Sequence, residues 1–389
     1  MSSQLPFPHA EARAASEQLQ QLVHSRIDDA GGCLPFDAFM EMALYQPGLG
    51  YYAGGLMPFG EQGDFITAPE SGRLFGRCLA RSVASVMQQL EQGVVLELGA
   101  GSGVLAADLL QELDRLDALP ERYYILERSG ALCALQRATL SRQVPELARR
   151  VEWLEALPEK PLRGVVFGNE VCDAMPVQRF CWLDGEVTEL GVRVSGSALS
   201  TCKRSAGEAL QAEVNRLARE YQWSGRYQSE LCPLLPAWAQ SLADCLASGL
   251  LLLIDYGYGQ TEYYHPQRSM GTLMCHYRHH AHDDPLWFPG LQDITAFVDF
   301  TRLAEAVTDA GMQLEGYASQ AQFLVACDIE QVMATFDSQD TQRFLQLSNE
   351  AKRLLLPGEM GERFKFIGFS RDLPAAVTGF SSQDLRSRL

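Results

Sequence analysis

The feature that most constrains this fold is an apolar run that ends in closely spaced glycines. Residues 94–98, Val-Val-Leu-Glu-Leu, lead directly into Gly99, Gly101 and Gly103, and a helical pattern covers about 103–113. Glycines permit a sharp turn and a close approach of ligand to backbone, and the N–H groups of the next helix can face that ligand. The pattern therefore predicts a strand, a nucleotide-binding turn and a helix.

Similar apolar runs alternate with helical patterns through the middle of the chain. Strands are predicted at 94–98, 123–127, 151–153, 165–167 and 250–255, with helices near 103–113, 130–142 and 232–248. Such alternation is typical of a parallel, doubly wound sheet, so the predicted fold class is α/β.

The flanking segments follow other patterns. Residues 178–204 alternate like a hairpin with Asp184-Gly185 as the turn, and 258–300 are loop-rich. Further elements are predicted as helices at 9–29, 36–44, 70–90, 300–310 and 340–355, a helix plus loop within 205–231, and a strand at 364–369.

The glycine spacing distinguishes two classes of nucleotide site. A dinucleotide fingerprint has its third glycine where this chain has Val104, which disfavours a nucleotide-dependent oxidoreductase. The pattern here is Glu-x-Gly-x-Gly-x-Gly, and the Glu97 carboxylate suits a cationic amino-acid ligand. Glu127 closes the next strand, where its carboxylate would accept hydrogen bonds from both ribose hydroxyls. Adenine should then lie near 151–154, where Trp153 either stacks on it or belongs to the core.

Composition and charge exclude several other classes. The net charge is −17, which argues against a general nucleic-acid binder. The ten cysteines include no CxxC pair and are expected to be reduced thiols. The first 20 residues match neither a secretory signal nor a transit peptide, and no apolar run is long enough to cross a bilayer. We therefore expect a soluble, cytoplasmic protein without membrane insertion.

The motifs resemble a known family. Glu97 to Gly103, together with Glu127, resembles the S-adenosylmethionine site of class I methyltransferases. Over about residues 17–370 the chain is similar to the MidA-like family, which includes the mitochondrial complex I assembly-factor type protein arginine methyltransferases. The strings that carry the resemblance are GYYAGG (50–55), GDFITAPE (63–70), LELGAGSG (96–103), GNEVCDAMPV (168–177), IDYGY (254–258), GTLMCHYRHH (271–280), DPLWFPGLQDIT (284–295) and MGERFKF (360–366).

This resemblance implies a Rossmann-like, seven-stranded, mostly parallel sheet with an N-terminal helical cap and an inserted lobe. The predicted division is a cap with a cofactor-covering loop (1–90), an S-adenosylmethionine-binding core (91–177), an inserted lobe (178–248), the remainder of the core with a substrate loop (249–375), and a tail (376–389).

The predicted donor contacts lie at the strand ends. They are Glu97, Gly99, Ala100, Gly101, Gly103, Glu127, Trp153, Leu154 and Asn169, with Asp64, Thr67 and Pro69 added by resemblance. Tyr51 and Tyr52 either line a substrate channel or serve packing.

The predicted reacting centre follows the fourth strand, because ligands bind beyond the carboxyl ends of parallel strands. Asn169, Glu170 and Asp173 should face the methyl donor. An arginine guanidinium is always cationic, so its methylation needs carboxylates that grip it and draw charge from the attacking nitrogen. Glu170 and Asp173 are the candidates, with Glu70 a third. Alternatively, Glu170 caps a turn or a helix.

The histidines form a second cluster. His265, His276, His279, His280 and His282 are either metal ligands, a general base or polar loop residues. No helical His-x-x-x-His spacing with a Glu is present, so no metal site is predicted. The family motif continues with histidine where this chain has Phe297, which puts turnover or substrate choice in question.

The predicted function is therefore S-adenosylmethionine-dependent methylation of arginine on a protein, for which the resemblance suggests a respiratory complex subunit. Nucleic acid is not expected as a partner, and a homodimer is left open. The alternatives are a donor-binding assembly factor with little or no catalysis and a methyltransferase for a small molecule. The target and the degree of methylation are not encoded in these motifs.

Overall fold

The structure is a computed structural model that describes residues 5–54, 68–90, 92–336, 340–381 and 384–389. The chain divides into two compact units. Unit 1 comprises Met1–Phe65, Cys172–Leu235 and Tyr258–Val298, and unit 2 comprises Ile66–Val171, Pro236–Gly257 and Asp299–Leu389.

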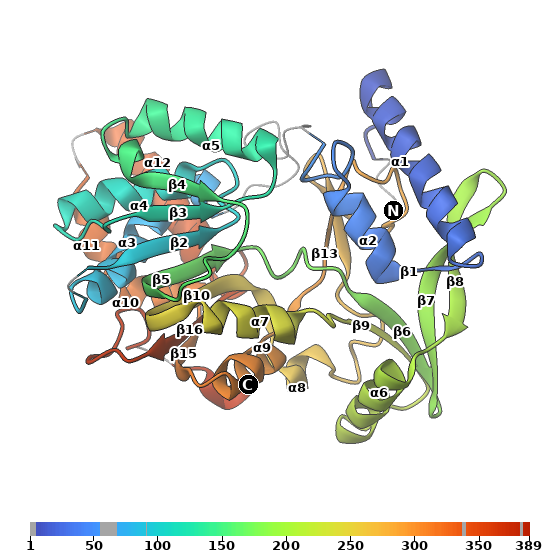
Figure 1. The fold of residues 1–389 in the computed structure, drawn as a ribbon. Coiled ribbons are helices and arrows are strands. Elements are labelled where there is room, and N and C mark those ends of the chain that lie inside the picture. Colours follow the sequence, from blue (N-terminus) through green and yellow to red (C-terminus); the bar gives the residue numbers. More distant parts are fainter. Residues whose placement is uncertain (1–4, 55–67, 91, 337–339, 382–383) are drawn as a thin grey trace. The chain divides into compact units, whose positions relative to one another are not determined.

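A mainly parallel sheet forms the centre of unit 2. Figure 1 shows its strands side by side in the order β15-β16-β10-β5-β2-β3-β4. The strands from β10 to β4 are parallel, whereas β16 runs antiparallel to both β10 and β15. A short strand, β14 (Val298–Asp299), pairs with β10 outside this order. The strand bounds are β2 (Val94–Leu98), β3 (Tyr123–Leu126), β4 (Val151–Leu154), β5 (Leu162–Asn169), β10 (Leu246–Tyr258), β15 (Gln313–Ser319) and β16 (Phe364–Arg371).

Helices supply the apolar partner that this sheet requires. The central strands are buried on both faces, so they contain near-continuous apolar runs such as Leu250 to Ile254. One face packs against α3, α4 and α10 to α12 in a single large core. The helices of unit 2 are α3 (Leu74–Met87), α4 (Val104–Arg115), α5 (Gly130–Gln143), α7 (Leu235–Asp244), α9 (Phe300–Asp309), α10 (Gln320–Ala326), α11 (Ile329–Ala334) and α12 (Thr341–Leu355), with 3-10 turns η1 (Pro69–Ser71), η2 (Leu147–Arg150) and η3 (Arg386–Arg388).

This architecture confirms the predicted α/β fold with a seven-stranded, mostly parallel sheet. The strands predicted from apolar runs are all present. Strand β15 and the short helices α10 and α11 were not predicted. β15 contains Gly316 in a Gln-Leu-Glu-Gly-Tyr sequence, which lacks a clear two-residue alternation.

Unit 1 is built on an antiparallel sheet. The strand order is β1-β7-β6-β9, with β8 paired to the other edge of β7. The predicted turn at Asp184-Gly185 is confirmed, with φ of +48° and +94°, the left-handed values of a two-residue hairpin turn. β9 was predicted as loop. The strands are β1 (Leu34–Pro35), β6 (Gln178–Leu183), β7 (Glu186–Ser195), β8 (Ala198–Ser205) and β9 (Arg226–Leu231).

The remaining elements of unit 1 pack around this sheet. A second small sheet has the order β12-β11-β13 and lies in the segment predicted as loop-rich. Helices α1 and α2 match the predicted N-terminal helices, and α2 contributes Phe36, Phe39 and Met40 to a core shared with Val192 of β7. The bounds are α1 (Ala10–Asp29), α2 (Phe36–Tyr45), α6 (Glu208–Glu220), α8 (Gln260–Tyr263), β11 (Met274–Tyr277), β12 (His280–His282) and β13 (Asp293–Thr295).

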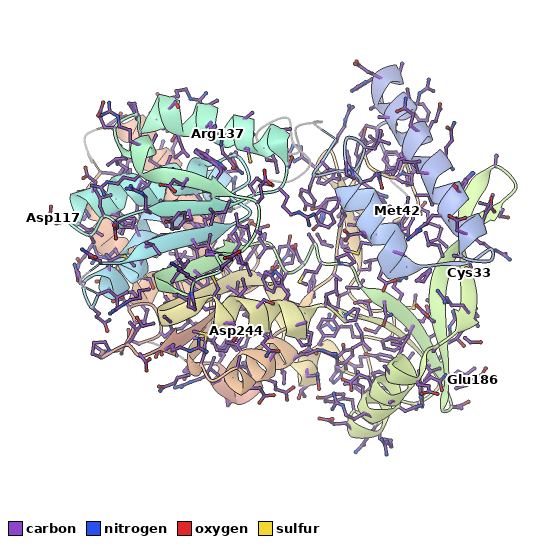
Figure 2. All side chains as sticks on the ribbon, viewed as in Figure 1. Cys33, Met42, Asp117, Arg137, Glu186 and Asp244 are labelled. Atoms are coloured by element: carbon purple, nitrogen blue, oxygen red, sulfur yellow. A yellow bond between two sulfur atoms is a disulfide. The ribbon has the colours of Figure 1, made fainter. Side chains whose placement is uncertain are left out.

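Two cysteines depart from the expectation of reduced thiols. Cys33, labelled in Figure 2, forms a disulfide with Cys202 of β8, with a Cα–Cα distance of 6.3 Å. The bond spans β7 at Gly191, which pairs with Pro35 on one side and Cys202 on the other. A Cβ at Gly191 would lie 3.0 Å from the sulfur of Cys33, so glycine makes room for the crossing. The two cysteines are 169 residues apart, and only the fold brings them together.

None of the described helices combines the length and apolar character that a bilayer crossing requires. The predicted division of the chain into five parts stays a prediction.

Candidate functional site

The turn between β2 and α4 has a left-handed backbone at each of its glycines. The φ angles of Gly99, Gly101 and Gly103 are +60°, +51° and +81°. A Cβ at Gly103 would lie 3.0 Å from the Cα of Gln136, and one at Gly99 would lie 3.3 Å from a methyl of Val171. Both backbone conformation and space therefore demand glycine, as the sequence pattern indicated.

Polar contacts fix this turn on both sides. The Ser102 hydroxyl donates a hydrogen bond to Glu70, which lies in η1. The Gln136 amide of α5 donates to the Gly101 carbonyl at 3.1 Å. Glu70, predicted as a third carboxylate for the substrate, is thus tied to the glycine turn. Ala100, between the glycines, is buried.

Glu127 lies directly after β3, as predicted for a ribose-binding carboxylate. One carboxylate oxygen accepts from the Ser129 backbone N–H at 2.8 Å, and the other accepts from Gln136 at 3.1 Å. Its own N–H donates to the carbonyl of Leu154 at 3.0 Å. Burial raises the pKa of Glu127, and these donors partly offset that effect.

Trp153 lies in β4 beside this carboxylate. Its indole N–H donates to the Gln136 carbonyl oxygen at 2.9 Å, and the Arg137 guanidinium lies 4.3 Å from the ring centre. The ring also packs against the core of unit 2, so one ring face and one edge are already engaged. The choice between adenine stacking and a core role stays open.

Glu97, in β2, is almost completely buried. Its carboxylate accepts a hydrogen bond from the Tyr123 hydroxyl at 2.7 Å. Burial raises the pKa of Glu97 to about 8, and the Tyr123 hydrogen bond lowers it by less. The protonated acid is therefore favoured at neutral pH, unless a cation arrives to stabilise the carboxylate.

The end of β5 carries the predicted reacting residues Asn169 and Glu170. The Asn169 amide donates to one oxygen of Glu170 at 3.0 Å, and the Tyr256 hydroxyl donates to the other at 3.4 Å. Glu170 has φ of +54°, a conformation that costs a residue other than glycine about 1–2 kcal/mol. Its N–H donates to the carbonyl of Ile254 at 2.8 Å, so neighbouring β10 holds this conformation.

Asn169 also carries an unsatisfied acceptor. Its side-chain oxygen is buried and has no hydrogen-bond partner within the described residues. A buried acceptor without a donor is costly, and such groups in native proteins often mark a ligand contact. The ammonium group of an amino-acid ligand is the kind of donor that would satisfy it.

The third predicted residue, Asp173, belongs to unit 1 and is almost completely buried. Burial raises the pKa values of Tyr45 and Tyr52, and the charges of Asp293 and Asp173 raise both further. Tyr52 donates to Asp293 at 2.9 Å, and the rings of Tyr45 and Tyr52 stack with centres 5.6 Å apart. Two carboxylates therefore lie beside two aromatic rings, surroundings that favour a cation.

The other predicted contacts are distributed as follows. Pro69 is buried in η1, and Leu154 is half-buried at the end of β4. Asp64 and Thr67 lie outside the described residues. Tyr51 is buried in the core that contains α2, whereas Tyr52 makes the carboxylate contact given above.

The histidines are divided between a small sheet and its loops. His276 and His282 lie on paired strands β11 and β12, and burial lowers the pKa of each. Over the described part of the chain, no group of three or more His, Cys, Asp or Glu side chains has the arrangement of a metal site. Phe297 donates its backbone N–H to the Thr272 hydroxyl at 3.0 Å and packs against Tyr258.

Sequence reasoning missed Gln136 as the residue that links these parts. It joins the glycine turn, Glu127 and Trp153 through three hydrogen bonds. The available signal is a polar residue at a core position: α5 buries Leu132, Gln136, Thr139 and Leu140, which share one helical face. Sequence analysis also did not place Tyr45 beside Asp293.

The fold and the glycine turn, with an acidic residue after the second strand, define a class I methyltransferase. The residues fit the donor: the turn offers backbone that glycines leave without side chains, Glu127 offers carboxylate oxygens, and Asn169 offers a buried acceptor without a hydrogen-bond partner among the described residues. A family model described as "Putative S-adenosyl-L-methionine-dependent methyltransferase" matches residues 78–318. The chain belongs to this family, and its cofactor is S-adenosyl-L-methionine.

Three relatives show the range of similarity. A protein from Burkholderia thailandensis, crystallised with bound S-adenosyl-homocysteine, is 43% identical with a TM-score of 0.95, over 99% of this chain and 100% of that chain. Protein arginine methyltransferase NDUFAF7, mitochondrial, from Rattus norvegicus is 28% identical over 92% of this chain and 85% of that protein. The Drosophila melanogaster homolog is 28% identical over 97% and 91%.

The names of the curated relatives correct one prediction, the location of the protein in the cell. They are mitochondrial proteins by name, which contradicts the cytoplasmic location predicted from the N-terminal sequence. The prediction failed because it was drawn from the absence of a targeting pattern, which is weak evidence for a location.

Proposed function

We propose that this methyltransferase modifies arginine side chains on a protein substrate. The observation that carries the proposal is the cluster of buried Asp173, half-buried Asp293 and Tyr52, and Tyr45 in unit 1. Carboxylates beside aromatic rings suit a planar guanidinium, which pairs with carboxylates and stacks on rings. The names of the curated relatives, which are protein arginine methyltransferases, agree with this substrate.

The donor would be held by residues of unit 2. The backbone of Gly99, Gly101 and Gly103 would line it, Glu127 would accept from its ribose, and Asn169 would accept from its ammonium group. When bound, S-adenosylmethionine supplies an activated methyl group. The protein's task is then to position the acceptor nitrogen and to manage its charge.

Glu170 and Asp173 stay the carboxylates predicted from the sequence for the acceptor guanidinium. A carboxylate that accepts from two guanidinium N–H groups draws positive charge toward them and leaves the attacking nitrogen more electron-rich. Tyr256 and Asn169 orient Glu170 from either side. The methylated product keeps a single positive charge, so one proton leaves the guanidinium during transfer.

The test uses the purified full chain with methyl-labelled donor and a native proteome, followed by mass spectrometry of methylated residues. Arginine labelling is expected with the unaltered chain. Glu170→Gln should lose about 100-fold in turnover while S-adenosyl-homocysteine affinity, measured by calorimetry, changes by less than about threefold. Glu159→Gln, an exposed site, is the matched control.

Two results would contradict the proposal. Label found only on lysine or on small molecules would remove the arginine assignment. Donor binding without any transfer, in the presence of the proteome, would favour a donor-binding assembly factor instead.

A further inference from the structure

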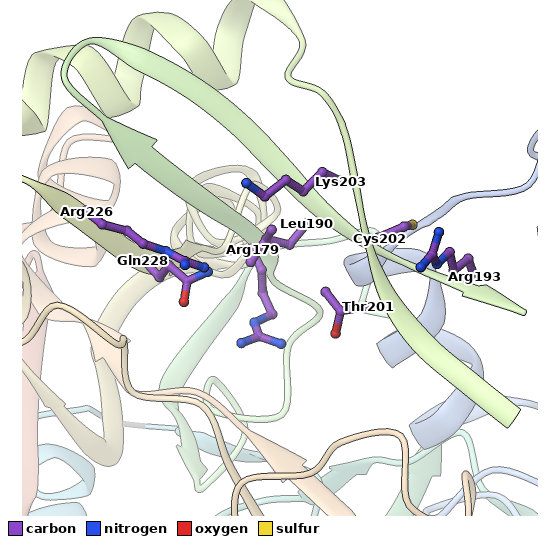
Figure 3. Close-up of a pocket in the computed structure, with 8 residues that line it drawn as sticks. All are labelled: Arg179, Leu190, Arg193, Thr201, Cys202, Lys203, Arg226 and Gln228. Carbon is purple, nitrogen blue, oxygen red and sulfur yellow. The ribbon is translucent and has the colours of Figure 1, made fainter. Parts of the chain in front are cut away.

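The sheet of unit 1 contains a hollow of about 430 Å³ with a strongly basic lining. Figure 3 shows its eight lining residues, of which four are cationic: Arg179, Arg193, Lys203 and Arg226. No lining residue is acidic. This concentration of positive charge is unexpected in a chain of net charge −17.

The cations reach the hollow from four neighbouring strands. Arg179 of β6 pairs with Leu190 of β7, which in turn pairs with Lys203 of β8. Arg226 begins β9, next to β6, and Arg193 lies further along β7. Neighbouring strands are about 4.8 Å apart, so the positive charges extend over about 10–15 Å.

Other arginines of unit 1 form ion pairs with carboxylates. Arg204 pairs with Glu189 at 3.5 Å, and Arg216 pairs with Glu213 at 2.9 Å. By contrast, none of the four cations forms an ion pair with a carboxylate of the residues that the structure describes.

Glu230 is the nearest candidate for such a partner, because it pairs with Arg179 across β6 and β9. Its carboxylate is committed elsewhere: one oxygen accepts from the Thr272 N–H and hydroxyl, each at 2.6 Å, and from the Tyr263 hydroxyl at 3.1 Å. Glu230 therefore lowers the local positive potential without closing the hollow.

We propose that this basic hollow binds a short acidic segment of a partner protein through its Asp and Glu side chains. The spread of the cations over four strands matches an extended segment, whereas a single phosphate group contacts cations converging on one point. Leu190 offers an apolar floor, and Gln228 and Thr201 offer polar groups for peptide backbone. The overall negative charge repels long polyanions, which favours a short segment over nucleic acid.

This binding site goes beyond the proposed function, since it requires neither the methyl donor nor turnover. The test measures fluorescence anisotropy of a fluorescein-labelled oligo-glutamate peptide, about eight residues long, titrated with the full chain at about 50 mM salt. The double variant Lys203→Gln/Arg226→Gln removes two exposed cations and should weaken binding about tenfold.

The matched control is Arg149→Gln/Lys160→Gln, which removes two exposed cations outside the hollow and should leave binding within about twofold. A second variant, Lys203→Glu, also lowers the charge of the hollow by two units and should weaken binding by at least tenfold. Circular dichroism and S-adenosyl-homocysteine affinity, unchanged in all variants, establish that folding is intact.

Three results would overturn the proposal. These are equal weakening by the hollow and control variants, no peptide binding at low salt, and tight binding of inorganic tripolyphosphate that the peptide fails to displace. The last result would assign the hollow to a small polyanion. Loss of arginine methylation alone would leave the proposal unaffected, because the readout is binding.

Discussion

Two buried polar side chains, Glu97 and Gln136, lie close to the glycine turn in otherwise apolar surroundings. Each is bonded to the protein: Glu97 to Tyr123, and Gln136 to Gly101, Glu127 and Trp153. Burial of a polar group costs free energy unless its hydrogen bonds are made. Substitution of either residue should therefore change the stability of the fold or the affinity for the donor.

The Glu97 carboxyl predicts a pH-dependent stability. Burial raises its pKa to about 8, above the value of the unfolded chain, so the folded protein keeps a proton that the unfolded chain releases. Its contribution to stability is therefore present below about pH 4.5 and is lost as pH rises toward about 8. Glu97→Gln keeps an acceptor for Tyr123 and removes this titration. Its melting temperature should match the unaltered chain near pH 4.5 and exceed it by a few degrees near pH 8.5.

Calorimetry at several pH values checks this expectation, with exposed Glu159→Gln as the control. A difference in melting temperature that does not change with pH would assign the effect to packing rather than to titration.

Gln136→Leu tests the link between the glycine turn and Glu127. The variant keeps the approximate volume but removes three hydrogen bonds. One oxygen of Glu127 loses its donor while the other stays bonded to Ser129, and the Trp153 indole N–H loses its acceptor. We expect S-adenosyl-homocysteine affinity to fall about tenfold, or about 1.4 kcal/mol, by calorimetry. Gln111→Leu, on the exposed side of α4, should change affinity by less than about twofold. Equal affinities of the two variants would exclude a positioning role for Gln136.

At the scale of elements, the glycine turn depends on backbone conformation as much as on side chains. Gly103→Ala places a Cβ 3.0 Å from the Cα of Gln136 at φ of +81°. We expect a loss of about 1–2 kcal/mol in the free energy of unfolding and weaker donor binding, because the turn and α5 must separate. Gly130→Ala, at the start of α5 with open space around it, should be neutral or slightly stabilising. Denaturant titrations of both variants decide the outcome, and similar losses would contradict the argument.

Sequence patterns predicted the strands that contain continuous apolar runs. They did not predict strands that are short or rich in polar residues. β2, β3, β5 and β10 have such runs, and Glu127 and Asn169 could be placed from them because the carboxyl ends of parallel strands share one edge. β9, Arg-Tyr-Gln-Ser-Glu-Leu, has two charged residues in six and was missed. The contacts of Gln136 and the Cys33–Cys202 bond join residues distant in sequence, so local patterns could not predict them.

The whole molecule combines two units with different means of stabilisation. Unit 1 contains the disulfide, which closes a separation of 169 residues between Cys33, just before β1, and Cys202 of β8. Unit 2 contains the large parallel sheet and the donor-binding turn. The disulfide stabilises the folded state because it lowers the conformational entropy of the unfolded chain. A ligand that binds only the folded protein stabilises that state through its binding free energy.

These two means of stabilisation should respond to different additions in a scanning calorimetry experiment. Reductant should lower the transition of unit 1, since the disulfide contributes on the order of 4–5 kcal/mol by chain entropy. S-adenosyl-homocysteine at about 100 times its Kd should raise the transition of unit 2 through about 2.7 kcal/mol of binding free energy. In Cys33→Ser/Cys202→Ser, the reductant effect should vanish while the ligand effect persists. A single transition that moves with both additions would show that the chain's repeated crossings between the units make them unfold together.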